Sequence, residues 1–527
     1  MKNSFFLIIP SQRKNPEQIK QFTENVLRHW VEELPTANPS LATRLFHDFI
    51  IEFNQLEMDS ALRLEALEIL RPSYIIIEDY LRSRLTQSNF PKTPGDQKIM
   101  DILFNIEKEF TLGYWVVTRD LTRRDSSWFQ NKTIALAIQR CIKGLGAIVV
   151  TFCTLYRAIP DWVWIDLHSL YKLGKALNKQ AVKVPAEFNN ATKTTTLELS
   201  YQHILLFSLA QPGRLMQKEI QQVYSFLEQL SPYIRIEDKP IAELDVQCVL
   251  RMDEDRPPSF QAYDAFLNDS AVRYLNFDKL FKVFKQKDKF SDPGLTRFSS
   301  IGGHSIGYSK LSIDLLDYLE QRWKACPLPE LMVFADRLDR YIGLGLEAAF
   351  NFLDTSNTQQ ESEVEYLAQT ASENCLVCDF NKPGVLSIGS LVSIRKIDAP
   401  EHKRALGVVS RLVTFKQDNK LNIEVDILAR RFYAVGFEYL EEKKQSSRKK
   451  ALLYGVKEQG KEEKSFIIIE SFLLKDGDII RMFMQNEDYP IILKDRTNIG
   501  LGYWQFECRR MPETVSSMAK KQGYDFI

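Results

Sequence analysis

The stretch Leu376-Val-Cys-Asp379-Phe-Asn381-Lys-Pro-Gly384-Val-Leu-Ser-Ile-Gly389-Ser-Leu-Val-Ser-Ile394 decides how the C-terminal part of this chain is expected to fold. An apolar, strand-like segment ends in a turn of Asp, Asn, Pro and Gly, and a second apolar segment follows. Further strand candidates surround it at 341–352, 405–415, 422–428, 434–440, 451–456, 465–470, 478–484, 489–494 and 502–509. Many short strands at even spacing, separated by turns, predict an antiparallel β-barrel.

The N-terminal part predicts helices instead. Asn38-Pro39 is a strong helix start, because Asn caps the free backbone N–H groups and Pro suits the first helical position. Asp59 is a second cap, and we expect Pro72 to end its helix. Further helices are expected at 74–86, 97–121, 131–157, 160–178, 195–211 and 214–230. Antiparallel helices joined by short turns form a bundle or an irregular solenoid.

The sequence therefore predicts an α+β multidomain protein. An N-terminal all-α bundle or solenoid covers 1–230, and a mixed α/β connector with strands at 233–238 and 245–251 covers 231–327. An antiparallel β-barrel with extra strands covers 328–512, and a C-terminal tail covers 513–527. The segment 162–174 loosely resembles one tetratricopeptide unit, but no second copy follows at a fixed period, so we do not predict a repeat array.

Composition limits the class of protein. The 527 residues include 69 Lys plus Arg and 69 Asp plus Glu, so the formal net charge is zero. A protein that coats nucleic acid would normally be basic, so that class is not expected. A local basic pocket for a small anion is still compatible with this balance. Seven scattered cysteines fit reduced thiols in a cytoplasmic protein, and the N-terminus lacks a signal-peptide pattern. The longest apolar stretch, 145–156, is too short to span a bilayer, so we expect no membrane insertion.

The turn at 379–384 resembles the PilZ family. In that family a strand ends in Asp/Asn-x-Ser-x-x-Gly, whereas the turn here reads Asp379-x-Asn381-x-x-Gly384, with Asn in place of Ser. The family's later Gly-x-Val-x-Trp/Arg strand is matched by 407–411. Its flexible Arg-x-x-x-Arg motif before the first barrel strand is matched, one residue short, by Arg337-Leu-Asp-Arg340.

The resemblance extends to the helical part. Segments 34–54 and 63–72 are similar to the N-terminus of large atypical PilZ proteins, a bacterial group of cyclic-di-GMP receptors linked to type IV pilus and motility control. It implies a ligand site for cyclic di-GMP, a non-catalytic signalling role, and an unidentified protein partner bound by the helical region. The oligomeric state is not predicted, and no cofactor or nucleic-acid polymer is expected.

The resemblance also implies the site residues. They are Arg337, Arg340, Asp379, Asn381, Gly384 and Arg411, with Arg395 as a further candidate. Arg337 and Arg340 would clamp the ligand, because a guanidinium pairs bidentately with phosphate and stacks on a base. Asp379 would accept from guanine N–H groups, and Asn381 would replace the Ser hydroxyl. Gly384 would allow the turn a positive φ.

A second interpretation is open. The substitution of Asn for Ser and the short Arg spacing are also typical of a degenerate PilZ-like scaffold that binds proteins and no nucleotide. Arginines flanking a strand are usually surface residues paired with acids, and Asp-x-Asn-x-x-Gly turns occur in many β proteins.

Other motifs predict no chemistry. Cys375-Leu-Val-Cys378 has no second pair at metal-ligand spacing, and an offset of three on a strand points the thiols to opposite faces. The Gly-rich segment 301–307 lacks the Lys of a phosphate-binding loop. No Gly-Gly-Asp-Glu-Phe or Glu-Ala/Val-Leu signature is present, so synthesis or hydrolysis of the nucleotide is not expected.

Overall fold

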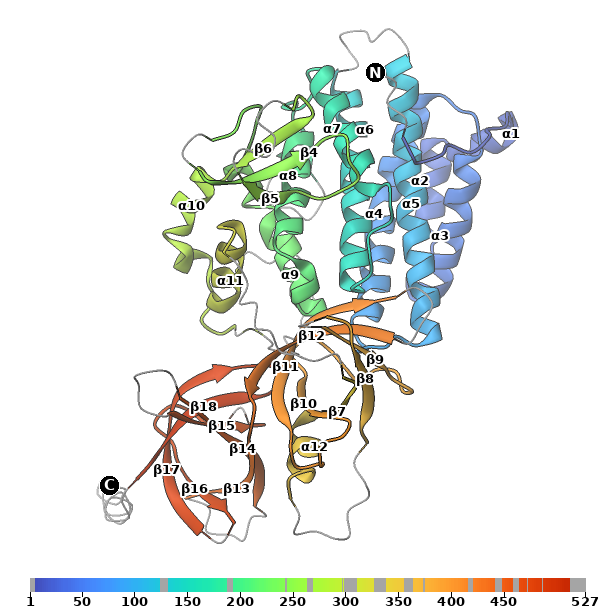
Figure 1. The fold of residues 1–527 in the computed structure, drawn as a ribbon. Helices are drawn as coiled ribbons and strands as arrows, with labels where there is room; N and C mark the ends of the chain where they lie inside the picture. Colours follow the sequence, from blue (N-terminus) through green and yellow to red (C-terminus); the bar gives the residue numbers. More distant parts are fainter. Residues whose placement is uncertain are drawn as a thin grey trace, which may run out of the picture. The chain divides into compact units, whose positions relative to one another are not determined.

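The computed structural model divides into two compact units, each described here by itself (Figure 1). One contains Met1–Ser88, Lys92–Leu295 and Gly303–Cys326, and the other contains Asn89–Pro91, Thr296–Gly302 and Pro327–Ile527. The residues that the structure describes are 5–123, 131–186, 193–241, 244–262, 269–295, 297, 310–326, 338–354, 364–372, 375–415, 420–440, 448–457, 464–471, 473–485 and 487–511.

The first unit is a helical bundle followed by a small sheet. Its helices are α1 (Pro16–Ile19), α2 (Glu24–Glu32), α3 (Pro39–Asn54), α4 (Ser60–Leu85), α5 (Pro94–Arg123), α6 (Asn131–Thr154), α7 (Val163–Ala176), α8 (Leu197–Leu209), α9 (Gln217–Leu227), α10 (Asp278–Phe284) and α11 (Ile313–Trp323). Two short strands, β1 (Val184–Pro185) and β2 (Thr194–Thr195), pair with each other. The expected helical N-terminal region is confirmed, except that this strand pair lies within the part predicted to be all-α.

Both predicted helix starts are confirmed by their caps. The Asn38 side-chain oxygen accepts from the N–H of Leu41 at 3.2 Å, at the start of α3. The Asp59 carboxylate accepts from the N–H of Ala61 at 2.8 Å, at the start of α4. Each cap satisfies one of the backbone donors that a helix leaves free at its first turn.

The expected helix end at Pro72 is wrong. Pro72 lies inside α4, which runs without interruption for 26 residues. An interior proline removes one hydrogen bond and costs about 3 kcal/mol in a helix. Here Pro72 faces solvent, while residues on the opposite side of α4, such as Leu67, Leu70 and Leu81, are buried. Tertiary burial of that face outweighs the local penalty, a balance that the local sequence alone does not reveal.

Helix α6 forms the centre of the bundle. It is long and apolar enough to cross a membrane, yet 83% of its most apolar window is buried inside the structure. It packs against α5, α7, α8 and α9. Among the described residues it is the one helix that meets these length and composition limits.

A buried ionic cluster joins α4, α5 and α6. The Arg82 guanidinium contacts the Glu78 carboxylate at 2.6 Å and the Glu107 carboxylate at 2.8 Å. The Thr151 hydroxyl donates to Glu107 at 2.6 Å, and the Ala147 carbonyl accepts from Arg82 at 2.9 Å. Glu107 is fully buried, so its carboxylate depends on these contacts in place of water.

The connector contains an antiparallel sheet in the order β3-β6-β4-β5. Its strands are β3 (Arg235–Glu237), β4 (Val246–Arg251), β5 (Ser259–Ala262) and β6 (Val272–Asn276). The predicted strands at 233–238 and 245–251 correspond to β3 and β4. The Gly-rich segment 301–307 lies outside the described residues.

His168 of α7 is a neutral, buried histidine that gives a pH prediction. Its Nδ1 lies 2.7 Å from the Tyr201 hydroxyl and its Nε2 lies 2.9 Å from the Arg256 carbonyl. Burial lowers the pKa of His168 to about 4 from its ordinary 6.5. Between these values the unfolded chain binds a proton that the folded chain does not. This group should therefore raise the free energy of unfolding by about 3 kcal/mol as the pH rises from 4 to 7.

The measurement is urea unfolding at several pH values, comparing the natural chain with His168→Gln. The comparison is needed because Asp166 opposes the effect. Burial raises the pKa of Asp166 from 3.8 to about 6, so its contribution to stability falls as the pH rises through that window. The difference between the two chains isolates His168. An imidazole that titrates near 6.5 by NMR would contradict the prediction.

The second unit contains two closed antiparallel barrels. The first has the order β10-β11-β12-β9-β8-β7 and the second β13-β14-β15-β18-β17-β16. Their strands are β7 (Arg340–Leu344), β8 (Tyr366–Thr370), β9 (Cys375–Asp379), β10 (Leu391–Lys396), β11 (Ala405–Thr414), β12 (Lys420–Ala429), β13 (Tyr433–Tyr439), β14 (Lys449–Val456), β15 (Lys464–Ile469), β16 (Ile479–Met484), β17 (Glu487–Asn498) and β18 (Trp504–Arg510). The expected extra strands thus close into a barrel of their own.

Helix α12 (Gly345–Asn351) replaces the second half of the strand expected at 341–352. Gly345 has φ +83, where the backbone turns from β7 into α12. Leu346 and Ala349 then face an apolar cluster that includes Leu406 of the first barrel and Leu452 of the second. The helix forms because it fills the space between two barrels, a contact that local periodicity cannot show.

Backbone also meets backbone where the barrels join. The N–H of Leu501 donates to the Gly389 carbonyl at 3.0 Å. A Cβ atom placed on Gly500 would lie 2.1 Å from that same carbonyl oxygen. Gly500 is therefore required for this close approach.

Candidate ligand-binding site

Strand alternation separates two of the predicted ligand residues of the first barrel. Arg340 pairs with Ala368, which pairs with Cys378, and all three are buried. Directly paired residues project to one face of a sheet, so the Arg340 side chain lies on the inner face. Asp379 follows Cys378 and is exposed, on the outer face. The structure does not bring Arg340 and Asp379 to the same face of the barrel wall.

The predicted turn at 379–384 is exposed and has the expected backbone. Asp379, Asn381 and Gly384 are all exposed. Gly384 has φ +75, which confirms that the turn needs a residue tolerant of positive φ. The ligand contacts expected of these residues stay a prediction.

A segment from outside the barrel sequence pairs with this turn. The Gly384 N–H donates to the Pro91 carbonyl at 3.0 Å. Phe90 and Leu386 exchange two backbone hydrogen bonds of 2.8 and 2.9 Å, and the Phe90 side chain is only 1% exposed. Residues 89–91 therefore belong to the barrel unit, although they lie between α4 and α5 in the chain. Sequence reasoning gave no signal for this pairing.

The other predicted arginines have different surroundings. Arg411 of β11 lies on the outer face and contacts the Glu424 carboxylate of β12 at 2.7 Å. Its side chain is 47% exposed, so this is a surface ion pair of small energy. Arg337 lies outside the described residues.

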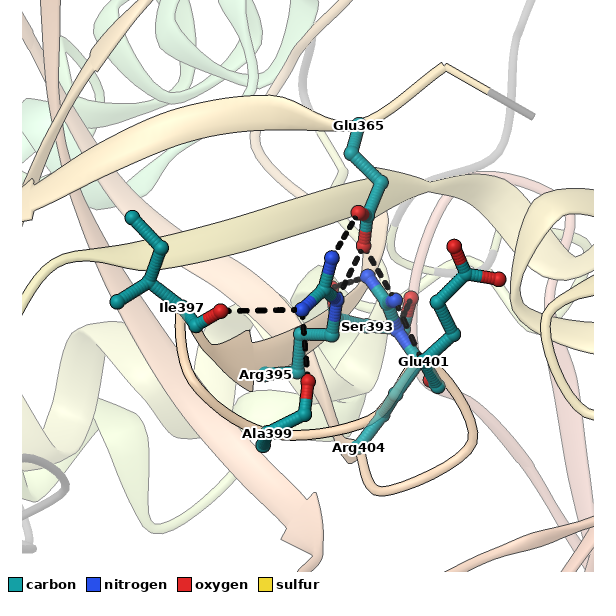
Figure 2. Close-up of polar contacts among 7 residues, drawn as sticks. All are labelled: Glu365, Ser393, Arg395, Ile397, Ala399, Glu401 and Arg404. Atoms are coloured by element: carbon teal, nitrogen blue, oxygen red, sulfur yellow. Dashed lines mark hydrogen bonds and ion pairs between the residues drawn. The ribbon is translucent and has the colours of Figure 1, made fainter. Parts of the chain in front are cut away.

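Arg395, the further candidate, belongs to a charged cluster on the outer face that Figure 2 shows. The Glu365 carboxylate accepts from Arg395 Nε at 2.8 Å and Nη2 at 2.5 Å, a bidentate pair. The same carboxylate accepts from Arg404 Nη1 at 2.6 Å. Two guanidinium groups thus share one acid, and the three side chains carry a net charge of one positive unit.

Each guanidinium is also held by contacts that do not involve Glu365. Arg395 Nη1 donates to the Ala399 carbonyl at 2.8 Å, and Arg404 Nε donates to the Ser393 hydroxyl at 3.0 Å (Figure 2). Arg404 Nη2 donates to the Ser393 carbonyl at 3.3 Å. These contacts to Ala399 and Ser393 hold the two guanidinium groups in position independently of Glu365.

Aromatic rings support both arginines. Arg395 lies 4.5 Å from the ring centre of Tyr341, its cross-strand partner in β7. Arg404 lies 4.0 Å from the ring centre of Phe352. The Phe352 ring fits because Gly343 has no side chain, since a Cβ there would lie 2.5 Å from it. Stacking on rings orients a guanidinium and excludes water from one of its faces.

The cluster is mostly shielded from solvent. The side chains of Arg404, Arg395 and Glu365 are 0%, 10% and 14% exposed. Burial raises the pKa of Glu365, but the hydrogen bonds from Arg395 and Arg404 outweigh it and hold that pKa below its ordinary value. Glu365 is thus a carboxylate at neutral pH. Sequence reasoning missed Glu365 and Arg404, because 39 residues separate them and no motif links them.

The described residues contain no group of three or more His, Cys, Asp or Glu side chains placed to hold a metal ion. Cys375 and Cys378 of β9 point to opposite faces, with Cys378 buried and Cys375 half-buried, as their spacing predicted.

Comparison with known proteins supplies a ligand class for a relative of this chain. Residues 25–241 match the family model described as the N-terminal domain of the cyclic-di-GMP receptor FimW. A curated relative, the cyclic-di-GMP receptor FimW of Pseudomonas aeruginosa, is 24% identical over 231 residues. That match covers 44% of this chain and only 38% of the relative's length. No solved structure matches the chain.

The family match falls on the helical part of the chain. It begins in α2 and ends after β3, so it includes the whole of α3 to α9. The resemblance of the helical region to cyclic-di-GMP receptors is thus confirmed at the level of the family model. Both barrels lie outside the matched residues, and every predicted ligand residue follows residue 241 in the sequence.

Proposed function

We propose that this protein is a non-catalytic, cytoplasmic effector that binds cyclic di-GMP through its first barrel, which we take to be a divergent PilZ domain. The observation that carries the proposal is the match of residues 25–241 to the N-terminal domain of a cyclic-di-GMP receptor. The helical unit would bind a protein partner, in pilus or motility control. Nucleotide binding would shift the protein between two states only as far as the ligand's affinities for those states differ.

Isothermal titration of the full chain with cyclic di-GMP tests the proposal. We expect saturable binding, and we expect Arg337→Ala combined with Arg340→Ala to weaken it at least about tenfold, through the loss of guanidinium contacts to phosphate and base. Arg28→Ala, a surface change on α2, is the control and should bind as the natural chain does. Unchanged affinity in the double variant would reject Arg337 and Arg340 as ligand residues.

A second function is favoured by two specific observations. Arg411 is already paired with Glu424, and Arg340 and Asp379 lie on opposite faces of the barrel wall. In a scaffold that binds proteins and no nucleotide, these residues need not converge on one ligand, so this arrangement would not impair its function. It predicts no heat of binding with cyclic di-GMP, together with partner binding that is unaffected when the nucleotide is added.

A further inference from the structure

The cluster of Arg395, Arg404 and Glu365 has the features of an anion-binding site in which the protein's own Glu365 carboxylate is the bound anion. Both guanidinium groups donate to one carboxylate, and the exposed Glu401 carboxylate is a second negative charge that acts on both arginines. A carboxylate and a phosphodiester each offer two oxygens to the fork of an arginine, which binds both bidentately. Glu365 thus fills the acceptor position between the two guanidinium groups.

The site would keep its shape if the carboxylate were displaced. Arg395 stays anchored by the Ala399 carbonyl and by Tyr341, and Arg404 stays anchored by Ser393 and the ring of Phe352. Preorganised donors lower the entropic cost of binding, because the side chains need not be ordered by the ligand.

We propose that Arg395 and Arg404 bind a phosphodiester group of a cyclic dinucleotide, and that Glu365 is an intramolecular competitor for that site. The inference rests on the proposed function, because it assigns the phosphate subsite of the same ligand. It adds a second phosphate subsite to the one proposed for Arg337 and Arg340, since cyclic di-GMP carries two phosphates. The ligand can bind only while Glu365 is out of the site, so the apparent affinity equals the intrinsic affinity multiplied by the fraction of molecules in which the site is open.

The test is isothermal titration of the full chain with cyclic di-GMP, in which Glu365→Gln keeps the size of the side chain and removes its charge. A site filled by Glu365 nine-tenths of the time or more gains at least about tenfold in affinity when the competitor is removed. Arg395→Lys keeps the charge but loses the planar fork, so it should lose affinity by about tenfold or more. Thermal unfolding of each variant checks that the barrel is folded.

The second barrel offers a matched control. Glu507 is also a nearly buried carboxylate between two cations, at 2.6 Å from Lys464 and 2.9 Å from Arg509. Glu507→Gln removes the same charge from a carboxylate that also contacts two cations, although these cations are exposed, and it should leave the affinity within about twofold. A gain in Glu507→Gln equal to that in Glu365→Gln would mean that net charge alone raises affinity, and would overturn the assignment.

The outcomes separate this inference from the proposed function. Binding by the natural chain with no gain in Glu365→Gln and no loss in Arg395→Lys overturns the subsite and leaves the receptor function standing. Binding seen only in Glu365→Gln supports the competitor and rejects nucleotide binding by the natural chain. If neither the natural chain nor Glu365→Gln binds cyclic di-GMP, both the receptor function and the phosphate subsite are rejected.

Discussion

Replacing Arg82 by Met should lower the free energy of unfolding of the helical unit by about 4 kcal/mol. The change leaves the carboxylates of Glu78 and Glu107 buried without the guanidinium that contacts both of them. Removing one partner of a buried ion pair typically costs 3–5 kcal/mol, because the remaining charge keeps its desolvation penalty. Urea unfolding of the full chain, followed by far-ultraviolet circular dichroism, measures the helical transition.

Two further variants make this prediction sharp. Arg82→Met combined with Glu78→Met and Glu107→Met removes all three charges and should recover most of the loss, since apolar side chains of similar size often replace buried ionic groups at little cost. Arg28→Met breaks the exposed pair with Glu24 on α2 and should cost less than about 1 kcal/mol. Equal effects of Arg82→Met and Arg28→Met would show that burial is not the cause.

The loss in Arg82→Met should also depend on pH. Burial already raises the pKa of Glu107 even with Arg82 present, and removing the guanidinium should raise it further. A carboxyl whose pKa is raised in the folded state contributes stability at low pH and loses it as the pH rises. The variant should therefore be closest to the natural chain in acid and furthest from it at neutral pH.

Gly500→Ala should destabilise the contact between the two barrels by about 2–3 kcal/mol. Its methyl group would lie 2.1 Å from the Gly389 carbonyl oxygen, so backbone must move, and overpacking of this kind costs about 1–3 kcal/mol. The hydrogen bond from the Leu501 N–H to Gly389 would be lost as well. Hydrogen exchange at Leu501 should become faster, and barrel unfolding should become less cooperative.

Gly436→Ala is the matched control for that experiment. Gly436 lies in β13 of the second barrel, and a Cβ there would meet no atom nearer than 3.6 Å, an ordinary contact. The control should change stability by less than about 1 kcal/mol. If Gly500→Ala behaves in the same way, the close approach at Gly389 is not what joins the barrels.

Local signals in the sequence predicted local structure well. Asn38 and Asp59 mark their helix starts because capping depends on the few residues that follow. Gly384 was expected at positive φ because the turn itself requires it. Most strands of both barrels were also expected, since apolar segments and turn residues alternate along this part of the chain.

The features that the sequence could not predict depend on contacts between distant residues. Pro72 was expected to end a helix, yet packing of the buried face of α4 carries the helix through it. Helix α12 exists because two barrels enclose it. Likewise, the pairing of Glu365 with Arg404 joins residues that share no motif, and strand register decides that Arg340 and Asp379 face opposite ways.

The pairing of Phe90 with Leu386 has a practical consequence for dissecting the protein. A fragment that starts at Pro327 contains every barrel strand but lacks Asn89–Pro91. It would expose the apolar surface that Phe90 covers and leave the backbone groups of Leu386 to water. The two units are interleaved along the chain, so neither is a module that a single cut can release intact. Supplying the missing segment as a short peptide should restore the fragment's stability.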